Sequence, residues 1–484
     1  MKLENLCRPF CGTGEKILFY LFLFLIPLQL RMTISWQGSE WDSIFLYLTD
    51  LLLVGIFILA ARDAHKTHRT NKTNPSTSLG INKPYKTYFL LILFFFVVAI
   101  SLFKSVDLGN SVYRLVKLLE FMLLYIYIMY RKEFLGLDRV LKIIVFSGIF
   151  QSILAIAQFY KQSSLGLKFI EAGKYLPGEP GVATFVSGTE KVMRAYGSFP
   201  HPNVLAAFLL LAIFCFYALW LKREKTRGLI GLIGPIGLMG LIFALFLTFS
   251  RGTILVFVFV SFAFFIMRFF QLRTFYHTEE RLVIGKRMMI LALFFVIFSI
   301  ISAIVVLPYF KTRFVEISLK EEAIDLRFFY NKMSISMIKE KPILGIGIGN
   351  FADYSRNYPA FLRAANKLYN SGGSTGQQIP EWLYQPTHNI YLLIAAEIGI
   401  FGALIFVVFL LIRFIKGIRP IRPKELSGLV GPMIFLFAGF LILGLNDHYF
   451  WTLQSGGIIF WLSLALMQNA NLKMQNDNVE LKIP

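Results

Sequence analysis

Long apolar runs dominate this sequence and restrict it to very few folds. A helix that crosses a bilayer needs about 17–25 mostly apolar residues in a row. Such runs occupy the segments 16–30, 44–61, 88–104, 111–130, 140–160, 203–221, 228–249, 253–270, 288–308, 389–412, 428–446 and 453–468. No small-residue cleavage site follows the first run, so we read it as a retained helix rather than a signal peptide. The pattern predicts an all-α polytopic membrane protein with about twelve transmembrane helices.

The composition excludes several other classes of protein. Of the 484 residues, 56% are hydrophobic, 16% are charged, and 51 are Phe, which is more than one water-soluble core could bury. The net charge of +21 comes from short basic clusters between the apolar runs, as in the loops of membrane proteins, and we expect no nucleic-acid partner. The three cysteines form no disulfide framework.

The distribution of Lys and Arg predicts the orientation. With the N-terminus inside, the inner segments hold 29 of the 49 basic residues, including those of the loops 62–87 and 222–227. Both termini are then cytoplasmic, and residues 469–484 form a cytoplasmic tail. The predicted organisation is helices one to nine within 1–308, with an outer loop at 161–202, then a large extracytoplasmic loop at 309–388, and helices ten to twelve within 389–468.

The large outer loop carries its own helical signal. Leu326, Phe329, Met333 and Met337 recur at spacings of three and four residues, which places them on one face of a helix that Pro342 ends. A loop of this length is usually functional.

Four polar segments lie at predicted helix ends, and the topology places all of them on the outer side. They are Arg194 to Asn203, the turn Ser250-Arg251-Gly252, Arg327, and Pro386 to Asn389. Arg251 lies between two apolar runs, where it could snorkel to lipid headgroups, but a guanidinium also grips phosphate oxygens with two hydrogen bonds. Arg327 could equally be a solvated helix residue.

Two histidines occur in these segments. His388 is the natural candidate for taking a proton from a hydroxyl, although a histidine before a helix can simply be a cap. For His201, which lies between two prolines that make the turn rigid, we favour a structural role.

Other charged groups lie in or beside the apolar runs. Arg114, Lys117 and Glu120 share one helix face, where the two cations could extend a phosphate site or Lys117 could pair with Glu120. Asp447, in a tight outer turn, could position nearby Arg or His groups. Asp50 and Glu397 are single acidic residues within predicted helices, where we expect them to form hydrogen bonds between helices rather than a phosphate site.

Other motifs fail. The run Gly345-Ile-Gly347-Ile-Gly349-Asn350 lacks the Lys-Ser/Thr of a phosphate-binding loop and follows no predicted strand. No outer segment has metal-ligand spacing, and Cys7 and Cys11 have no partner ligands nearby. The sequence therefore predicts a cationic site without metal or cofactor, suited to an anionic substrate whose leaving group is a phosphate.

Ordered blocks of the sequence resemble the bacterial O-antigen ligase and polymerase superfamily of integral-membrane glycosyltransferases. The blocks are Arg194 to Asn203, Thr248 to Thr253, Arg327 with Lys341 to Phe351, and His388 to Leu392 followed by Glu397, Gly399 and Gly402. Together they cover roughly residues 190–415. The resemblance implies a GT-C-like fold in the bacterial cytoplasmic membrane, with the active site on its outer face.

The same resemblance implies an activity and a site. The family passes a glycan from an undecaprenyl-pyrophosphate carrier to an acceptor hydroxyl, which a glycan, lipid or protein supplies. Arg251 and Arg327 would bind the pyrophosphate, with Arg194 and Asn203 beside them in roles that vary across the family. His388 would be the base or would orient the acceptor, and one displacement would invert the anomeric carbon. A polymerase of lipid-linked repeats, or a transporter of the same lipids, is the alternative.

Overall fold

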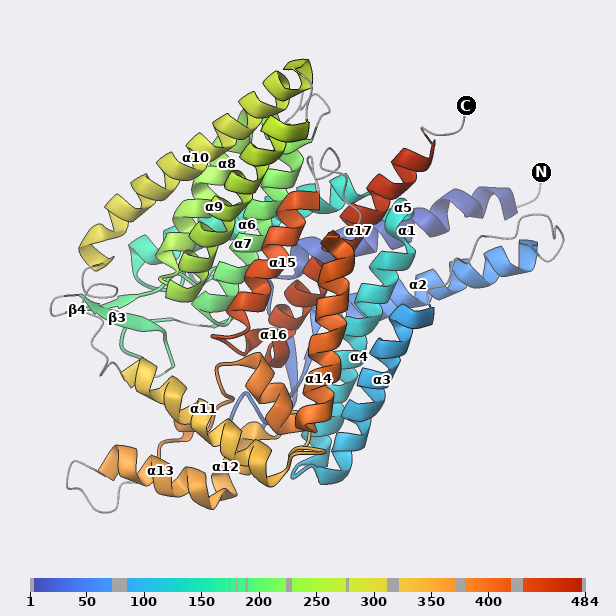
Figure 1. Ribbon diagram of the computed structural model, residues 1–484. Helices are drawn as coiled ribbons and strands as arrows, with labels where there is room; N and C mark the ends of the chain where they lie inside the picture. The colour runs from blue at the N-terminus through green and yellow to red at the C-terminus, as the bar shows by residue number, and fades with distance from the viewer. Residues whose placement is uncertain are drawn as a thin grey trace.

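A computed structural model describes residues 4–71, 85–173, 175–179, 181–187, 190–222, 229–275, 278–310, 322–370, 379–418 and 430–480. Each predicted apolar segment lies mainly within a helix (Figure 1). These helices are α1 (Glu4–Leu25), α2 (Leu48–Asn71), α3 (Tyr85–Ser101), α4 (Leu108–Tyr130), α6 (Leu137–Lys161), α7 (Pro202–Leu221), α8 (Leu229–Leu247), α9 (Arg251–Phe275), α10 (Thr278–Phe310), α14 (Ile390–Ile418), α15 (Val430–Leu443) and α17 (Gln454–Glu480). In the loop predicted at 62–87, residues 62–71 instead continue α2 and residues 85–87 begin α3, while 72–84 lie outside the described residues. Of the loop predicted at 222–227, only Lys222 is among the described residues.

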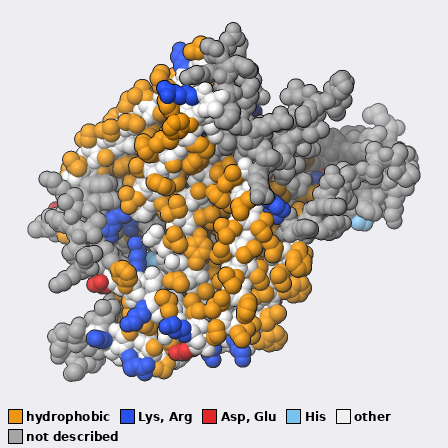
Figure 2. Space-filling view, viewed as in Figure 1, with side chains coloured by type: hydrophobic (Ala, Val, Ile, Leu, Met, Phe, Trp, Pro, Cys, Tyr) orange, Lys and Arg blue, Asp and Glu red, His pale blue; other side chains and the backbone are white. Residues whose placement is uncertain are grey.

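The helices form a bundle whose surface is apolar. Within the described residues, five helical segments are long and apolar enough to cross a membrane: Leu137–Lys161, Pro202–Leu221, Arg251–Thr274, Leu282–Tyr309 and Ile390–Ile418. Hydrophobic side chains cover most of the coloured face in Figure 2. A helix that is apolar all round is either buried or in contact with lipid. The protein is therefore a helical integral membrane protein, and the full number of spans stays a prediction.

Helix α7 lies in the centre of the bundle, and α10 lies at its edge. In the most apolar part of α7, 94% of the residues are buried by other helices, whereas for α10 only 22% are. Both helices are strongly apolar, and the span in α10 is the more apolar of the two, so composition alone does not identify the central helix.

Two antiparallel hairpins modify the all-α expectation. Strands β1 (Arg31–Ser35) and β2 (Ile44–Tyr47) form one hairpin, and β3 (Thr184–Ser187) and β4 (Glu190–Met193) form the other. Residues 44–47, assigned from hydropathy to the second apolar segment, are therefore strand rather than helix. Their alternating burial is the period-two pattern of a half-buried strand.

The predicted large loop forms a layer of short helices. It contains α11 (Glu322–Glu340), α12 (Phe351–Asn357), α13 (Pro359–Asn370) and the 3₁₀ turn η3 (Glu381–Leu383). Met333 and Met337 are buried in a separate hydrophobic cluster of this layer, so the amphipathic helix predicted there is confirmed. The layer lies at the opposite end of the bundle from the start of α1 and the end of α17 (Figure 1).

The glycine-rich run at 345–350 inserts into a break in α14. The backbone N–H groups of Ile346 and Gly347 donate to the carbonyls of Ala396 (3.0 Å) and Glu397 (2.8 Å). Gly399 there has φ +80°, and a Cβ atom at this position would lie 2.0 Å from the carbonyl oxygen of Ile343. The glycines thus serve close backbone packing, in agreement with the prediction that this run is no nucleotide loop.

Candidate functional site

Three of the four polar segments that the sequence placed on one side of the membrane line one pocket, and the fourth, Pro386 to Asn389, contributes no residue to its lining. We call it the arginine pocket, and its volume is about 380 Å³. Its lining comes from the start of α7, the turn between α8 and α9, α11, and the turn that follows α15. The lining residues are Arg194, Asn203, Phe249, Ser250, Arg251, Gly252, Thr253, Leu255, Val256, Arg327, Ile442, Leu443, Asn446, Asp447 and Tyr449. Three arginines against one aspartate make the lining cationic.

A tight turn places Arg251 at the first position of α9. Phe249 has φ +48°, which reverses the chain after α8. The Ser250 N–H donates to Thr248 Oγ1 (3.2 Å), and the Ser250 hydroxyl bonds Thr253 Oγ1 (3.0 Å). The guanidinium of Arg251 therefore adds its charge to the positive end of a 25-residue helix, and both favour an anion.

Arg194 is buried and held by two other segments. Its Nε donates to the carbonyl of Thr248 (2.7 Å), and its Nη2 donates to Asn203 Oδ1 (2.6 Å). The Asn203 amide in turn donates to Asp447 Oδ2 (2.7 Å). These consecutive hydrogen bonds fix Arg194, Asn203 and Asp447 relative to one another.

His201 caps α7. Its Nδ1 accepts a hydrogen bond from the backbone N–H of Asn203 (3.1 Å), one of the donors that a helix start leaves unpaired. Burial, and next the charge of Arg194, lower the pKa of His201 to about 3, so the ring is neutral and can accept this bond. The geometry agrees with the structural role predicted for this residue.

His388 lies beside a second histidine, His448. The two rings are 4.8 Å apart and nearly perpendicular, and the ring of Tyr330 stacks on His388 at 5.9 Å. The Nδ1 of His388 is buried and has no hydrogen-bond partner among the described residues. Burial lowers the pKa of His388, and it lowers that of His448 to about 3. Both imidazoles are therefore neutral near pH 7.

Asp447 lies next to the histidine pair. Burial opposes ionisation of its carboxyl, but a proton on a neighbouring histidine and the positive charge of Arg327 favour the carboxylate, and the pKa of Asp447 lies below the usual value. The ligand atoms of His388, Asp447 and His448 all lie within 4.8 Å of one another. These three residues could hold a metal ion, so the absence of a metal stays a prediction.

Arg114 and Lys117 do not lie in the arginine pocket. Arg114 donates to the carbonyls of Thr452 and Trp41 (2.7 Å each), and Lys117 forms an ion pair with Asp50. Lys117 also lies 3.6 Å from Glu120, the alternative pairing that the sequence suggested.

These two cations line a second cavity, which we call the aromatic pocket. Its lining residues are Arg31, Glu40, Trp41, Phe45, Tyr47, Tyr113, Arg114, Lys117, Leu118, Phe121, Ile348, Gly349, Ala352, Pro386, Glu397, Phe450, Trp451, Thr452, Leu453, Gln454 and Trp461. Asp50 and Glu397 form hydrogen bonds that join different helices, as expected. Asp50 accepts a hydrogen bond from Gln454 (2.6 Å), and Glu397 accepts one from Trp451 (2.8 Å).

Sequence reasoning missed His448, Tyr330 and Trp41. His448 follows Asp447 directly and could have been found as a second histidine at the outer boundary. The ring of Trp41 meets His448 at 5.1 Å, but it comes from a hairpin that hydropathy does not reveal.

Comparison with known proteins gives one family match. The family model described as O-antigen ligase matches residues 236–407, which include Arg251, Arg327 and His388. A solved structure described as "Structural coordination of polymerization and crosslinking by a peptidoglycan synthase complex" is 15% identical, with 81% of this chain and 99% of that chain covered and a TM-score of 0.37. No curated protein matches the chain.

Proposed function

We propose that the chain is a member of the O-antigen ligase and polymerase superfamily, whose family model matches residues 236–407, and that it transfers a glycan from undecaprenyl pyrophosphate to an acceptor hydroxyl. One observation carries this proposal: arginines from three distant segments surround a pocket beside a neutral histidine. The reaction takes place on the outer face of the bacterial cytoplasmic membrane, where nucleotide sugars are absent and a lipid-linked donor is needed.

The arginine pocket holds the pyrophosphate of the donor. Arg251 and Arg327 contact its oxygens, and the buried Arg194 adds a third positive charge that Asn203 keeps in place. These charges stabilise the carrier pyrophosphate as it leaves, so the leaving group requires no proton.

His388 serves as the general base. The acceptor oxygen forms a bond to the anomeric carbon and passes its proton to the imidazole, while the bond from that carbon to the pyrophosphate oxygen breaks and its electron pair leaves with the carrier. The lowered pKa of His388 keeps the imidazole in the form that can accept a proton. A single displacement of this kind inverts the anomeric configuration.

A matched pair of arginine variants on α9 tests the proposal. Arg251→Lys keeps the charge but loses the planar fork, and the loss of one charge-assisted hydrogen bond should reduce transfer about 10- to 100-fold. Arg273→Lys, at the far end of the same helix and outside the arginine pocket, should transfer normally. The measurement is transfer from a radiolabelled lipid-linked oligosaccharide by purified protein. Equal activity of the two variants would show that Arg251 does not bind the pyrophosphate through a bidentate contact.

The proposed chemistry requires no metal. EDTA should leave transfer by the purified enzyme unchanged, and added Mg²⁺ or Zn²⁺ should not increase it. Loss of activity in EDTA, with recovery on adding one of these ions, would instead assign the cluster of His388, Asp447 and His448 to a metal.

A further inference from the structure

A third cavity lies between the α11–α13 layer and the turn that precedes α4. Its volume is about 430 Å³, and among the described residues it shares no lining residue with the arginine pocket or the aromatic pocket. The end of α11, α12 and the start of α13 form most of its wall. Its lining includes Val106, Glu340, Tyr354, Asn357, Tyr358 and Arg363, and we call it the tyrosine pocket.

Two opposite charges line the tyrosine pocket without neutralising each other. Glu340 and Arg363 are both exposed, and neither forms an ion pair with a residue that the structure describes. The pocket therefore presents one carboxylate and one guanidinium to a ligand. A carboxylate attracts an ammonium group, and a guanidinium binds phosphate oxygens with charge-assisted hydrogen bonds. The pair suits a zwitterion that carries both an ammonium group and a phosphate.

Two tyrosines make the carboxylate side of the pocket favourable for a cation. The ring centres of Tyr354 and Tyr358 are 5.3 Å apart. The Tyr358 hydroxyl donates to Glu340 Oε1 (2.6 Å), and Ser336 bonds the same hydroxyl (2.7 Å), so the carboxylate is held beside the rings. Its second oxygen, Oε2, has no hydrogen bond to a described residue. An ammonium group at this oxygen can also lie over an aromatic face, which attracts cations.

The tyrosine pocket lies beside side chains that belong in lipid. Val106 of its wall is exposed and follows the 3₁₀ turn η1 (Leu102–Lys104), in which Phe103 is 85% exposed. Leu108, at the start of α4, is exposed as well. Large apolar side chains exposed at the ends of two apolar helices indicate contact with the membrane, and tyrosines gather at the level of the headgroups. The pocket is therefore at the depth of phospholipid headgroups.

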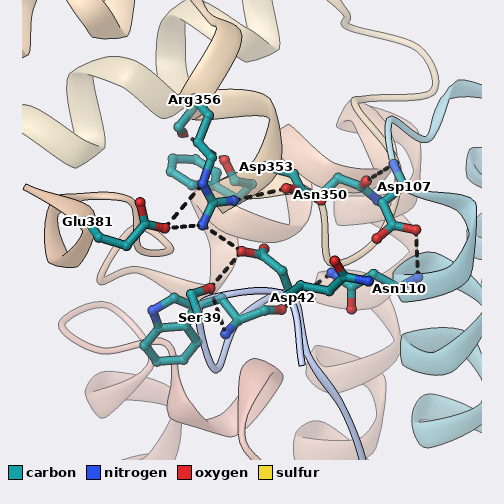
Figure 3. Close-up of polar contacts among 12 residues, drawn as sticks. Ser39, Asp42, Asp107, Asn110, Asn350, Asp353, Arg356 and Glu381 are labelled. Carbon is teal, nitrogen blue, oxygen red and sulfur yellow. Dashed lines mark hydrogen bonds and ion pairs between the residues drawn. The ribbon is translucent and has the colours of Figure 1, made fainter. Parts of the chain in front are cut away.

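A polar network fixes the walls of the tyrosine pocket (Figure 3). Arg356 of α12, which does not line the pocket, forms an ion pair with Asp42 in the loop of the β1–β2 hairpin (2.7 Å). At the other wall, the backbone N–H of Asp107, next to Val106, donates to Asn350 Oδ1 (2.7 Å). Three segments that are far apart in the sequence thus hold α12 in place, and a ligand meets a preformed cavity.

We propose that the tyrosine pocket binds the headgroup of a zwitterionic phospholipid such as phosphatidylethanolamine. The ammonium group contacts Glu340 and the ring of Tyr354, and the phosphate contacts Arg363. Glu340 ends the helix that carries Arg327, so a lipid bound here ties the α11–α13 layer to the membrane surface. This site does not depend on the glycan transfer proposed above.

Lipid retention tests this assignment. The full-length protein is reconstituted in nanodiscs of equal parts phosphatidylethanolamine and phosphatidylglycerol with the same acyl chains, and native mass spectrometry counts the lipids that it retains in detergent. The wild type should prefer phosphatidylethanolamine, because phosphatidylglycerol has no ammonium group. Glu340→Gln can still accept the Tyr358 hydrogen bond but loses the charge, and it should reduce this preference about fivefold. Arg363→Gln should weaken the retention of both lipids.

The matched control for the carboxylate is Asp325→Asn, at an exposed acid near the other end of α11, and it should keep the wild-type preference. Equal retention of the two lipids by the wild type, or an unchanged preference in Glu340→Gln, would overturn the headgroup assignment. Soluble phosphoethanolamine, titrated by calorimetry into protein in phosphatidylglycerol nanodiscs, should not bind saturably, since no acyl chains hold it at this depth. Saturable binding would instead assign the pocket to a soluble zwitterion.

Discussion

Asn203 donates a hydrogen bond to Asp447 over 2.7 Å, although 244 residues separate the two in the chain. Because Asn203 also accepts from Arg194, one amide side chain orients an arginine and an aspartate that face the same pocket.

The role of His388 predicts a difference between its variants and a matched histidine. His388→Gln can form hydrogen bonds but is a very weak base, so transfer should fall about 10²- to 10⁴-fold while donor binding remains. His65→Gln, at an exposed histidine of α2, should have no effect. Transfer kinetics and binding of the lipid-linked donor are measured separately. If His388→Gln kept most of its activity, the residue would only orient the acceptor.

The pH dependence of transfer follows from the same histidine. Burial lowers the pKa of His388 below its usual 6.5, so the imidazole is mostly neutral at pH 7 and above. Its contribution to the rate should then be nearly constant from pH 8 to 7 and should decrease only at lower pH. A rate that already halves near pH 7 would contradict the lowered pKa.

Acid should destabilise the fold through its buried histidines. The pKa values of His201 and His448 are about 3 in the folded protein, against 6.5 for an exposed histidine, so the unfolded chain binds more protons between these values. Stability is therefore retained above pH 6.5 and lost as the pH falls below it, by up to about 1.4 kcal/mol per pH unit for each group. Thermal unfolding in detergent at pH 7.5, 6 and 5 measures this slope. His201→Asn keeps a side chain that can cap α7 but removes one titratable imidazole. The stability of this variant should therefore fall less steeply with decreasing pH than that of the wild type.

The break in α14 predicts a strong effect at Gly399. Its φ of +80° and ψ of 170° suit only glycine, so Gly399→Ala should cost about 1–3 kcal/mol from strain, besides the clash with the carbonyl of Ile343. Gly240→Ala in α8 is the control, because no atom lies within 4 Å of its added Cβ and alanine favours a helix. Thermal unfolding compares the two variants, and a Gly399→Ala protein as stable as the control would refute the close packing.

Labelling of single cysteines checks the predicted orientation. With the native cysteines changed to serine, Lys339→Cys on α11 should react with an impermeant maleimide in intact spheroplasts, and His65→Cys on α2 only after permeabilisation. Both positions are exposed, so access to the reagent depends on the side of the membrane. If only His65→Cys reacted in intact spheroplasts, the orientation would be the opposite of the predicted one.

Hydropathy predicted the helices well, since a run of apolar residues has few alternatives in a membrane. It also predicted the gathering of Arg194, Arg251 and Arg327, because topology assigns helix ends to one side before any packing is known. It misplaced residues 44–47, where a short apolar strand directly precedes a helix and the two runs merge.

Which helix faces meet could not be predicted in the same way. The spacing of Arg114 and Lys117 shows that they share a face of α4, but it does not show what that face contacts. Their partners are Trp41, Thr452 and Asp50, which come from distant elements. The aromatic pocket therefore became visible only with the packing.

The insertion of the glycine-rich run into α14 has a mechanical consequence for His388. Leu393 and Ala396, before the break, pack in the hydrophobic cluster of the α11–α13 layer, while Ile390 and Ile394 of the same segment pack in the main bundle. The segment that follows His388 is therefore clamped between the layer and the bundle. The position of His388 relative to Arg251 on α9 thus depends on both of these packing surfaces at once.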